Sequence, residues 1–537
     1  MNFTDGPSVQ NPTEFLAIVL AGHGSELQPL TSNVGDQPSP KALLPIANKP
    51  VISYILNWIE EARIKDVLLI CPTLHRDAIN HYINSDPSSS SFSSLNVDIQ
   101  TFDDTQDSPA GTAAVLSHFA TRIQTDFIVL PCDFLPPPSL RLESILNNFR
   151  LNTETDGSIG TALFYEMRSR SPADTDKTTA AFEDAWGSPD PPMPIVYSSN
   201  GSGSRTLLHI DSPDSQDISP DELLLRSCTL TSYPRSTLST RLVDADVYVL
   251  RRSVLDALLL KRSTFDSIRE DFIPWLCKLS THPAKRQKYL SILFPTSSQT
   301  HSQALALQHS TSNTPQALQK LKAPASEDSI TSSPDIGDID DTGRKTMPSL
   351  RMGLVIHHLS DGLALRANNL FAYLELNRLL LNTGAGASSQ VTVGPSLSTS
   401  PSSTKPQPLI DPKATITPDT VIGSSTRIGA RSSVKKSSIG SHCLIGSNVK
   451  LTGCVVLDHC VIEDGSKLDG CILGRGTKVG PRAEMSRCVT QGAYEVEEGT
   501  VIKNERLEVS DWTSRAAQGE DSDDEGEGDE NSEELSE

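Results

Sequence analysis

A glycine-rich turn followed by a lysine is the segment of this sequence best suited to chemistry. Gly22 and Gly24 come directly after the apolar run 15–20, and Lys41 follows within residues 39–45. Glycines allow backbone N–H groups to approach a phosphate closely, and a lysine can neutralise its charge. These residues therefore predict a loop that binds a phosphate group.

The wider pattern resembles the signature of the sugar-1-phosphate nucleotidyltransferases. The matching segments are Gly22-His23-Gly24, Pro40-Lys41-Ala42-Leu43-Leu44-Pro45, Asn48-Lys49-Pro50, Gly111-Thr112-Ala113 and Leu130-Pro131-Cys132-Asp133. The resemblance covers most of residues 14–382. It implies a nucleotide pocket formed by Gly22, Gly24, Lys41, Gly111 and Asp133, in which Asp133 takes the place of a metal carboxylate.

Two positions depart from what catalysis by that family requires. Members of the family use positive charge on the triphosphate, and many use two carboxylates that hold Mg²⁺. In this sequence Glu26 stands where the family has an arginine, and Arg366 falls near the place of the second carboxylate. We therefore expect a vestigial pocket with no catalytic residue, no metal and no cofactor. Whether the pocket retains nucleotide binding is left open by the sequence.

Alternating strand and helix patterns predict the elements that position these residues. Strands are expected at 15–20, 67–71, 97–102, 127–131, 158–164 and 242–250, and helices at 50–62, 112–123, 140–149, 254–260, 268–279 and 370–381. This order is typical of a doubly wound α/β domain, here spanning residues 14–382. Stretches 169–204 and 282–348 lack periodicity and predict disordered insertions, and 383–408 predicts a linker.

A ladder of aliphatic residues dominates the C-terminal part of the chain. It comprises Ile416, Ile422, Ile428, Val434, Ile439, Ile445, Leu451, Leu457, Ile462, Leu468, Leu473, Val479 and Met485. A period near six fits neither a helix nor an alternating strand, but suits short strands wound three to a turn. We predict a left-handed parallel β-helix of hexapeptide repeats at 409–507, with Ile-Gly pairs such as Ile439-Gly440 at its tight corners. A β-sandwich is the alternative.

Such coils serve either as acyltransferase sites or as assembly surfaces. An acyltransferase needs a catalytic histidine at a coil edge, and the candidates are His442 and His459. Both lie in polar, corner-like contexts, so we expect solvated corner residues and a coil used for assembly.

Charge is distributed unevenly along the chain. The 537 residues have a net charge of −21, and residues 520–537 hold eleven Asp or Glu and no Lys or Arg. The N-terminal tail 1–13 and the acidic tail 508–537 are therefore expected to be disordered, and the charge argues against direct nucleic-acid binding. No apolar run is long enough to span a membrane, and nine scattered cysteines predict neither zinc binding nor a disulfide scaffold. We expect a protein of the cytoplasm, in the cytosol.

The combination of domains resembles a narrower family, the nucleotidyltransferase-like subunits of translation initiation factor 2B. The most specific matches are segments 242–248 and 267–276. The missing C-terminal helical-repeat domain favours the gamma type over the epsilon type. The resemblance implies a non-enzymatic subunit that pairs with the epsilon subunit, assembles with alpha, beta and delta subunits into a decamer, and promotes GDP-to-GTP exchange on initiation factor 2.

Two other functions remain open from the sequence. One is an active sugar-1-phosphate nucleotidyltransferase similar to GDP-mannose pyrophosphorylase, favoured by the glycine loop, Lys41 and Asp133 but opposed by Glu26. The other is a regulatory subunit that binds sugar nucleotides and controls an active partner enzyme.

Overall fold

The computed structural model describes most of the chain as two units. The described residues are 14–34, 37–85, 92, 94–102, 110–167, 186, 193–199, 204–211, 223, 225–261, 264–294, 348–382 and 408–508. The first unit comprises residues up to Gly24, Pro40–Leu44 and Lys49–Tyr373, and the second comprises Ser25–Ser39, Pro45–Asn48 and the chain from Leu374 onward. The predicted tails, and the linker before residue 408, lie outside the described residues.

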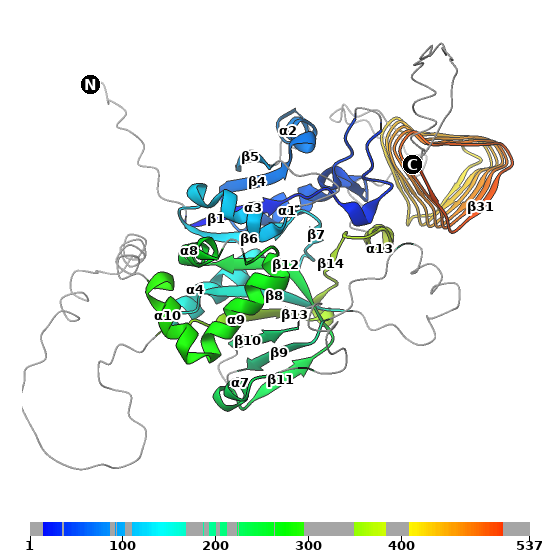
Figure 1. The fold of residues 1–537 in the computed structure, drawn as a ribbon. Coiled ribbons are helices and arrows are strands. Elements are labelled where there is room, and N and C mark those ends of the chain that lie inside the picture. The colour runs from blue at the N-terminus through cyan, green and yellow to red at the C-terminus, as the bar shows by residue number, and fades with distance from the viewer. Residues whose placement is uncertain are drawn as a thin grey trace, which may run out of the picture. The chain divides into compact units, whose positions relative to one another are not determined.

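A ten-stranded mixed sheet forms the centre of the first unit (Figure 1). Its strands are, in spatial order, β11 (Ser236–Ser239), β9 (Ile195–Ser199), β10 (Arg205–Ile210), β13 (Met352–His357), β8 (Gly160–Glu166), β12 (Leu242–Leu250), β6 (Asp126–Pro131), β1 (Phe15–Leu20), β4 (Asp66–Pro72) and β5 (Asn96–Phe102). Strands β6, β1, β4 and β5 run parallel, and β12 lies antiparallel between β6 and β8. The α/β prediction is confirmed.

Helices cover both faces of this sheet because its central strands are apolar on both sides. In β1, Ile18 belongs to one buried cluster, and its neighbours Ala17 and Val19 belong to the other. The helices over the first cluster are α3 (Thr112–His118), α8 (Arg252–Leu260), α9 (Ile273–Thr281) and α10 (Pro283–Leu293). Those over the second cluster are α1 (Val51–Glu61), α2 (Arg76–Ser85) and α4 (Leu142–Asp156).

The site predicted from sequence lies at the carboxyl ends of the strands where the strand order of this sheet reverses. Strand β1 has β4 on one side and β6 on the other, both parallel to it. The carboxyl ends of parallel strands meet at such a switch point, and ligands of open α/β sheets bind there. A small antiparallel ladder of β7 (Phe134–Leu135) and β14 (Leu365–Arg366) follows directly after β6.

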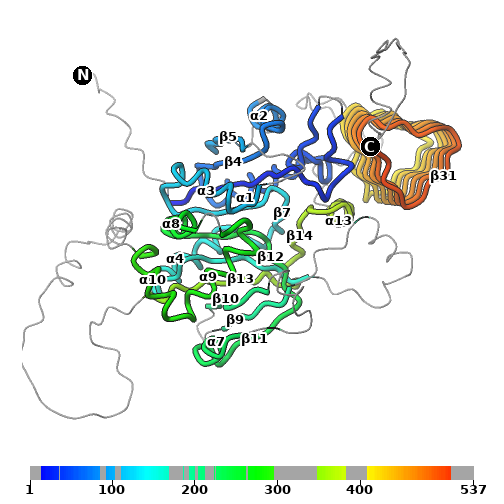
Figure 2. The backbone as a smooth tube through the Cα atoms, in the orientation of Figure 1, coloured from blue at the N-terminus to red at the C-terminus, as the bar shows by residue number. Residues whose placement is uncertain are grey.

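The second unit contains a parallel β-helix with three faces, whose triangular section is visible in Figure 2. The first face has β15 (Leu409–Ile410), β18 (Arg427–Ile428), β21 (Leu444–Ile445), β24 (Val461–Ile462), β27 (Lys478–Val479) and β30 (Glu495–Val496). The second has β16 (Thr415–Ile416), β19 (Ser433–Lys435), β22 (Lys450–Thr452), β25 (Lys467–Asp469), β28 (Glu484–Ser486) and β31 (Val501–Lys503). The third has β17 (Val421–Ile422), β20 (Ser438–Ile439), β23 (Val455–Val456), β26 (Ile472–Leu473), β29 (Val489–Thr490) and β32 (Arg506–Leu507).

The coil interior agrees with the predicted ladder at every position except one. Val456, not Leu457, pairs with Ile439 and Leu473 and belongs to the buried coil cluster. Interior residues of this face are seventeen positions apart, from 439 to 456 and from 456 to 473. A spacing of six from Leu451 leads to Leu457, one residue beyond the true interior position. Adjacent residues of a strand point to opposite faces, so this shift of one residue exchanges the interior and exterior side chains. All five coil cysteines are buried in the same cluster, as their small apolar side chains predicted.

The Ile-Gly pairs lie at the start of the corners, since Gly440 stands between β20 and the turn at residues 441–442, but these glycines do not carry the left-handed backbone. Left-handed backbone is found elsewhere, for example at His442 (φ 57°), His459 (φ 61°) and Gly476 (φ 74°). Gly440 is required for a different reason: a Cβ there would lie 2.7 Å from the backbone nitrogen of Asp458 in the next coil. The glycine permits close stacking of successive coils.

Two parts of the predicted insertions are ordered elements. Strand β9 (Ile195–Ser199) lies within 169–204 and pairs with both β10 and β11, with Ile195 and Val196 buried. Helix α10 (Pro283–Leu293) lies within 282–348 and buries Tyr289 and Leu293. Their few apolar side chains carry no clear period, so only packing against the rest of the unit reveals them. The remaining parts of both insertions are mostly outside the described residues.

No helix in the described part of the chain combines the length and apolar character needed to cross a bilayer.

Candidate functional site

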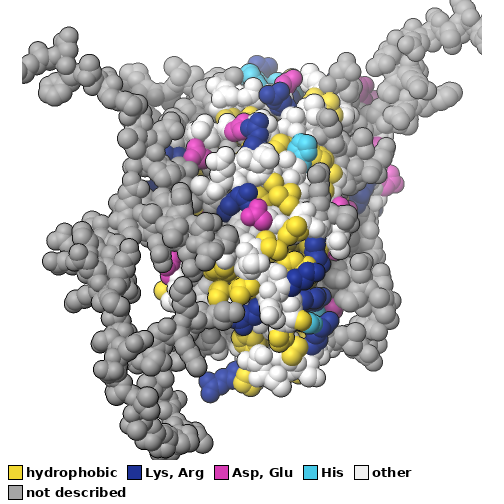
Figure 3. Space-filling view, turned by 60° about the vertical axis from the view of Figure 1, so that its left-hand side comes forward, with side chains coloured by type: hydrophobic (Ala, Val, Ile, Leu, Met, Phe, Trp, Pro, Cys, Tyr) yellow, Lys and Arg dark blue, Asp and Glu magenta, His cyan; other side chains and the backbone are white. Residues whose placement is uncertain are grey.

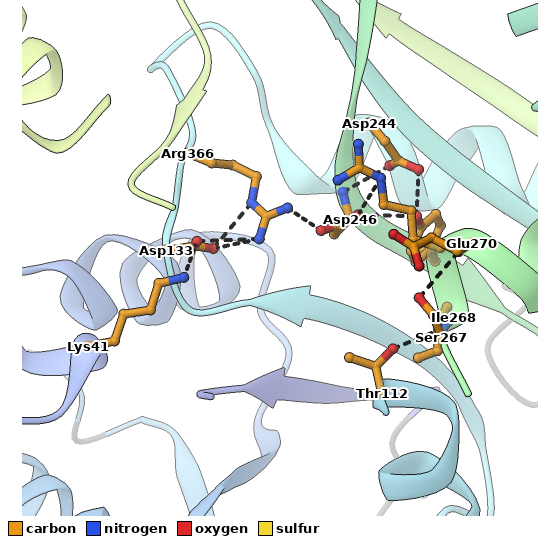
Figure 4. A network of polar contacts seen from close by, with 11 residues as sticks. Lys41, Thr112, Asp133, Asp244, Asp246, Ser267, Ile268, Glu270 and Arg366 are labelled. Atoms are coloured by element: carbon orange, nitrogen blue, oxygen red, sulfur yellow. Dashed lines mark hydrogen bonds and ion pairs between the residues drawn. The ribbon is translucent and has the colours of Figure 1, made fainter. Parts of the chain in front are cut away.

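Asp133 is the centre of the candidate site (Figure 4). Its carboxylate follows the carboxyl end of β6 and is only 1% exposed. Lys41 Nζ lies 2.6 Å from Asp133 Oδ2, and the Arg366 guanidinium approaches the same carboxylate through Nε and Nη2 at 3.2–3.3 Å. Two cations thus hold one buried carboxylate.

The charges of these cations determine the protonation of Asp133. Burial alone would raise the pKa of its carboxyl group, but Arg366 and Lys41 hold that pKa well below its usual range. The carboxylate is therefore ionised at every physiological pH.

A second carboxylate completes the coordination of Arg366. Its Nη1 donates a hydrogen bond to Asp246 Oδ2, and only 12% of the Arg366 side chain is exposed. The guanidinium lies between Asp133 and Asp246, as Figure 4 shows. A planar fork of N–H donors is well suited to bridging two carboxylates.

Local backbone features bring the two carboxylates to Arg366. The β7–β14 ladder pairs Arg366 with Phe134, next to Asp133, and Ala367 N donates to Asp133 O at 2.9 Å. In β12 the register shifts between Asp244 and Val247, and Asp246 takes a left-handed φ of 54°. Such a bulge redirects a side chain out of the normal alternation of a strand.

The network continues from Asp246 to the buried carboxyl group of Asp244. Tyr248 Oη donates to Asp244 Oδ2 at 2.5 Å, and Asp246 N donates to Asp244 Oδ1 at 2.9 Å. Arg269 Nε lies 3.9 Å from Asp246 Oδ1. Burial, followed by the negative charge of Asp246, raises the pKa of Asp244 to about 7.

These residues do not fit a divalent metal. Mg²⁺ requires oxygen ligands in near-octahedral geometry, whereas the guanidinium already lies between the two carboxylates and offers only donors. Within the described residues no group of three or more His, Cys, Asp or Glu could hold a metal ion. The arginine supplies the positive charge that a cation would otherwise bring to Asp133.

The three predicted pocket glycines differ in their surroundings. A Cβ on Gly24, which has φ 79°, would lie 2.9 Å from Lys41 Cβ, so this turn packs on the lysine. Gly22 is exposed, with open space where a Cβ would be. A Cβ on Gly111 would lie 2.2 Å from Asp266 O, which shows a tight structural contact at the start of α3. The structure therefore brings Gly24, Lys41 and Asp133 together, and the nucleotide pocket stays a prediction.

The structure also shows the surroundings of the other residues that the sequence singled out. His23 packs edge-on against buried His75, with ring centroids 5.4 Å apart. Glu26 is exposed in the short helix η1 (Ser25–Leu27). His442 and His459 are exposed on coil corners with stacked rings 5.1 Å apart, as expected for solvated positions.

Asn48 of the Asn48-Lys49-Pro50 motif belongs to the second unit and contacts the coil. Its Nδ2 donates to Ile439 O at 2.7 Å, and Ser438 Oγ donates to Asn48 Oδ1 at 3.2 Å. The adjacent Ala47 N donates to Asn377 Oδ1 of α13 (Leu370–Asn382) at 2.9 Å.

Sequence reasoning missed the role of Asp246. Asp246 lies 120 positions from Arg366 in sequence, and Asp244, Tyr248 and Arg269 gave no signal. The arginine in a carboxylate's place was the one available signal, because a buried arginine needs carboxylate partners.

Comparisons with known proteins agree with this architecture. The family described as Nucleotidyl transferase matches residues 16–171, and the EIF2B subunit epsilon LbH domain matches residues 405–502. The coil is therefore a left-handed β-helix. The curated translation initiation factor eIF2B subunit gamma of Schizosaccharomyces pombe is 32% identical over 271 residues, which are 50% of this chain and 52% of that relative.

The same subunit of Dictyostelium discoideum is 24% identical over 447 residues, which cover 80% of this chain and 87% of that relative. The chain is thus similar to two eIF2B gamma subunits. The alignment with the Schizosaccharomyces eIF2B gamma subunit spans about half of that protein's length. A Methanocaldococcus jannaschii protein named for UTP–glucose-1-phosphate uridylyltransferase activity is 34% identical over 65 residues, which are 12% of this chain and 21% of that protein.

Proposed function

We propose that this chain is a non-enzymatic gamma subunit of the eIF2B guanine-nucleotide exchange complex. In this proposal it pairs with the epsilon subunit, assembles with alpha, beta and delta subunits into a decamer in the cytosol, and promotes GDP-to-GTP exchange on initiation factor 2. The similarity to two gamma subunits and to the eIF2B-specific coil domain supports this role.

The single observation that carries the non-enzymatic part is the position of Arg366. Nucleotidyl transfer joins two anions, and catalysis needs mobile positive charge on the reacting phosphates. Here Lys41 and Arg366 are both engaged by Asp133, and Asp246 engages Arg366 from the other side. The cations of the site neutralise the protein's own carboxylates.

Affinity purification of the chain from its own cells, with mass spectrometry of stable partners, tests the assembly. We expect stoichiometric recovery of the other four exchange-factor subunits together with initiation factor 2. Recovery of an active sugar pyrophosphorylase in their place would contradict the proposal and favour a regulatory subunit of that enzyme.

Sugar-1-phosphate nucleotidyl transfer is the second candidate, favoured by Lys41 near the glycine loop and by the uridylyltransferase relative. The purified chain is incubated with Mg²⁺, sugar 1-phosphate and each nucleoside triphosphate, and pyrophosphate release is measured. We expect no release above the level of an Asp133→Asn variant. Release by the native chain that the variant loses would establish an enzyme.

A further inference from the structure

Five cations of the first unit lie in or next to the helices α7 (Ser227–Ser232), α8, α9 and α10. Arg226 precedes α7, Lys261 follows α8, Lys278 lies in α9, and Lys285 and Lys288 lie in α10. We call these five residues the basic patch. Partial burial and neighbouring positive charges lower the pKa of Lys285, and those neighbours are Arg226, Lys278 and Lys261. Lys285 is therefore close enough to these three cations to be repelled by them, and Lys288 and Lys261 both contact the ring of Tyr289.

Acidic side chains do not balance this group within the helices that carry it. Residues 273–294, which include α9 and α10, contain four Lys or Arg and no Asp or Glu. No ion pair within the described residues includes any member of the basic patch. In a chain of net charge −21, this local excess of positive charge is not a consequence of composition.

Aromatic rings beneath the patch support two of the lysines. Lys261 Nζ lies 5.3–6.0 Å from the ring centroids of Phe265, Trp275 and Tyr289, and Lys288 Nζ lies 5.5 Å from that of Tyr289. Contact with an aromatic face stabilises a cation without neutralising it. All three rings are buried, so they offer no platform on which nucleic-acid bases could stack.

Exposed leucines flank the same patch. Leu259 and Leu260 immediately precede Lys261 and are 39% and 63% exposed, and Leu230 follows Arg226 by one helical turn and is 47% exposed. Figure 3 views the side where Figure 1 shows α8 and α10, and Lys and Arg gather over its lower half with hydrophobic side chains between them. Exposed apolar side chains with polar residues around them mark protein interaction sites.

We propose that the basic patch and its flanking leucines bind an acidic, leucine-bearing segment of a partner protein. Carboxylates of that segment pair with the five cations, and its aliphatic side chains cover Leu230, Leu259 and Leu260. The chain's own acidic stretches are competing occupants of this surface. Residues 212–222 contain four acidic residues and Ile218 and are followed by Leu223, Leu224 and Leu225, whereas residues 520–537 contain one aliphatic residue, Leu535.

Binding of defined probes to the full-length chain tests the proposal. The probes are a fluorescein-labelled peptide that alternates Glu and Asp with Leu, a peptide in which Ser replaces each Leu, and a single-stranded oligonucleotide of equal charge. At about 50 mM salt, where screening is weak, we expect the leucine-bearing peptide to bind at least about tenfold more tightly than either other probe.

Charge reversal at the patch and at a matched control site identifies the surface. The variant K278E/K285E/K288E is expected to weaken binding by about tenfold or more, whereas K435E/K450E/K503E on the coil, with the same change in net charge, changes it less than about twofold. The variant L259S/L260S should abolish the preference for leucine. Circular dichroism and thermal unfolding establish that each variant is folded.

Four outcomes would overturn the proposal. Equal weakening by both charge-reversal variants would indicate a net-charge effect. Equal binding of the serine peptide would remove the apolar component, and tighter binding of the oligonucleotide would indicate a nucleic-acid surface. Neutralisation of Asp214, Asp217, Asp221 and Glu222 that raises affinity for the peptide by about tenfold would show that the chain's own segment occupies the patch.

Discussion

Arg366 has a structural role that follows directly from its surroundings. It bridges Asp133, which is almost fully buried, to Asp246, and Lys41 contacts Asp133 from another direction. A buried ion pair gives little net stability compared with apolar residues, but removing one partner leaves a charge without its partner. The effect of a substitution therefore depends on which charge remains.

Replacing Arg366 with Met should strongly destabilise the first unit. The variant leaves the Asp133 carboxylate with Lys41 alone, and we expect the free energy of unfolding to fall by about 3–5 kcal/mol in urea titrations. The control is Arg122→Met, which breaks an exposed pair with Asp98 and should cost about 0–1 kcal/mol. Equal losses in both variants would show that the Asp133 network contributes no more than a surface pair.

Asp244 should make stability decrease with rising pH near neutrality. Its folded pKa of about 7 exceeds the value of about 3.9 expected in the unfolded chain, so the folded state binds the proton more tightly. That contribution is present below pH about 4 and is lost as the pH rises through about 7. Asp133 acts oppositely: its lowered pKa gives stability above pH about 4 that is lost in acid.

The variant Asp244→Asn tests this sign. It keeps an oxygen that can accept the Tyr248 hydroxyl but cannot ionise, so the variant should be more stable than the native chain at pH 8. The relative gain should shrink at pH 5.5. Free energies of unfolding at both pH values, with Asp256→Asn as an exposed control, provide the measurement. A gain that does not depend on pH would contradict the assignment.

At the scale of elements, glycines occur in the coil for two different physical reasons. Gly440 lies where the backbone of the next coil approaches closely, whereas Gly476 adopts φ 74° with no atom nearer than 3.9 Å to a Cβ placed there. At Gly440 a side chain would clash with the next coil, whereas at Gly476 a side chain would fit but would have to adopt left-handed backbone.

Gly440→Ala should therefore destabilise the coil more than Gly476→Ala. We expect about 3 kcal/mol for the first change, from overpacking, and about 1 kcal/mol for the second, from left-handed backbone. Ala493 already adopts φ 57° in the following coil, which shows that alanine fits such a corner. Hydrogen exchange of coil amides in the full chain measures both losses, and the reverse order would refute the stacking argument.

At the scale of the whole molecule, the second unit is assembled from segments far apart in sequence. Asn48 contacts Ser438 and Ile439, and Arg378 of α13 donates to Gly453 O at 3.2 Å. The outward residues Val455, Ile472 and Val489 of the third coil face are buried, whereas Leu409 and Leu444 on the first face are exposed. The outward residues of the third face are thus buried in the chain, whereas those of the first face are open to solvent.

Asn48→Ala should loosen the coil near residues 438 and 439. The variant loses one donated and one accepted hydrogen bond, which we expect to cost about 1–3 kcal/mol. The matched control is Lys49→Ala, an exposed neighbour in the same motif. Faster hydrogen exchange at the coil strands in the asparagine variant alone is the expected result; equal exchange in both variants would argue against docking of the motif.

The sequence by itself determined the elements whose pattern is local and repeated. Phe15–Leu20 and Leu242–Leu250 were predicted with the bounds that the structure has. The first is a continuous apolar run, and the second is an apolar strand interrupted by Asp244 and Asp246 and bounded by arginines at 241 and 251. The coil followed from its period alone, since every turn must bury the same interior position. Helix α10 and strand β9 were missed because their burial depends on neighbours far along the chain.

Tertiary structure alone decided the candidate site and the coil register. Asp133, Asp246 and Arg366 are more than a hundred residues apart in sequence, and no local pattern records that a bulge in β12 and the β7–β14 ladder bring them together. Val456 replaces Leu457 in the interior because the pairing of neighbouring coils fixes the register. A local pattern specifies which segments are buried, whereas contacts between distant segments specify which charges meet.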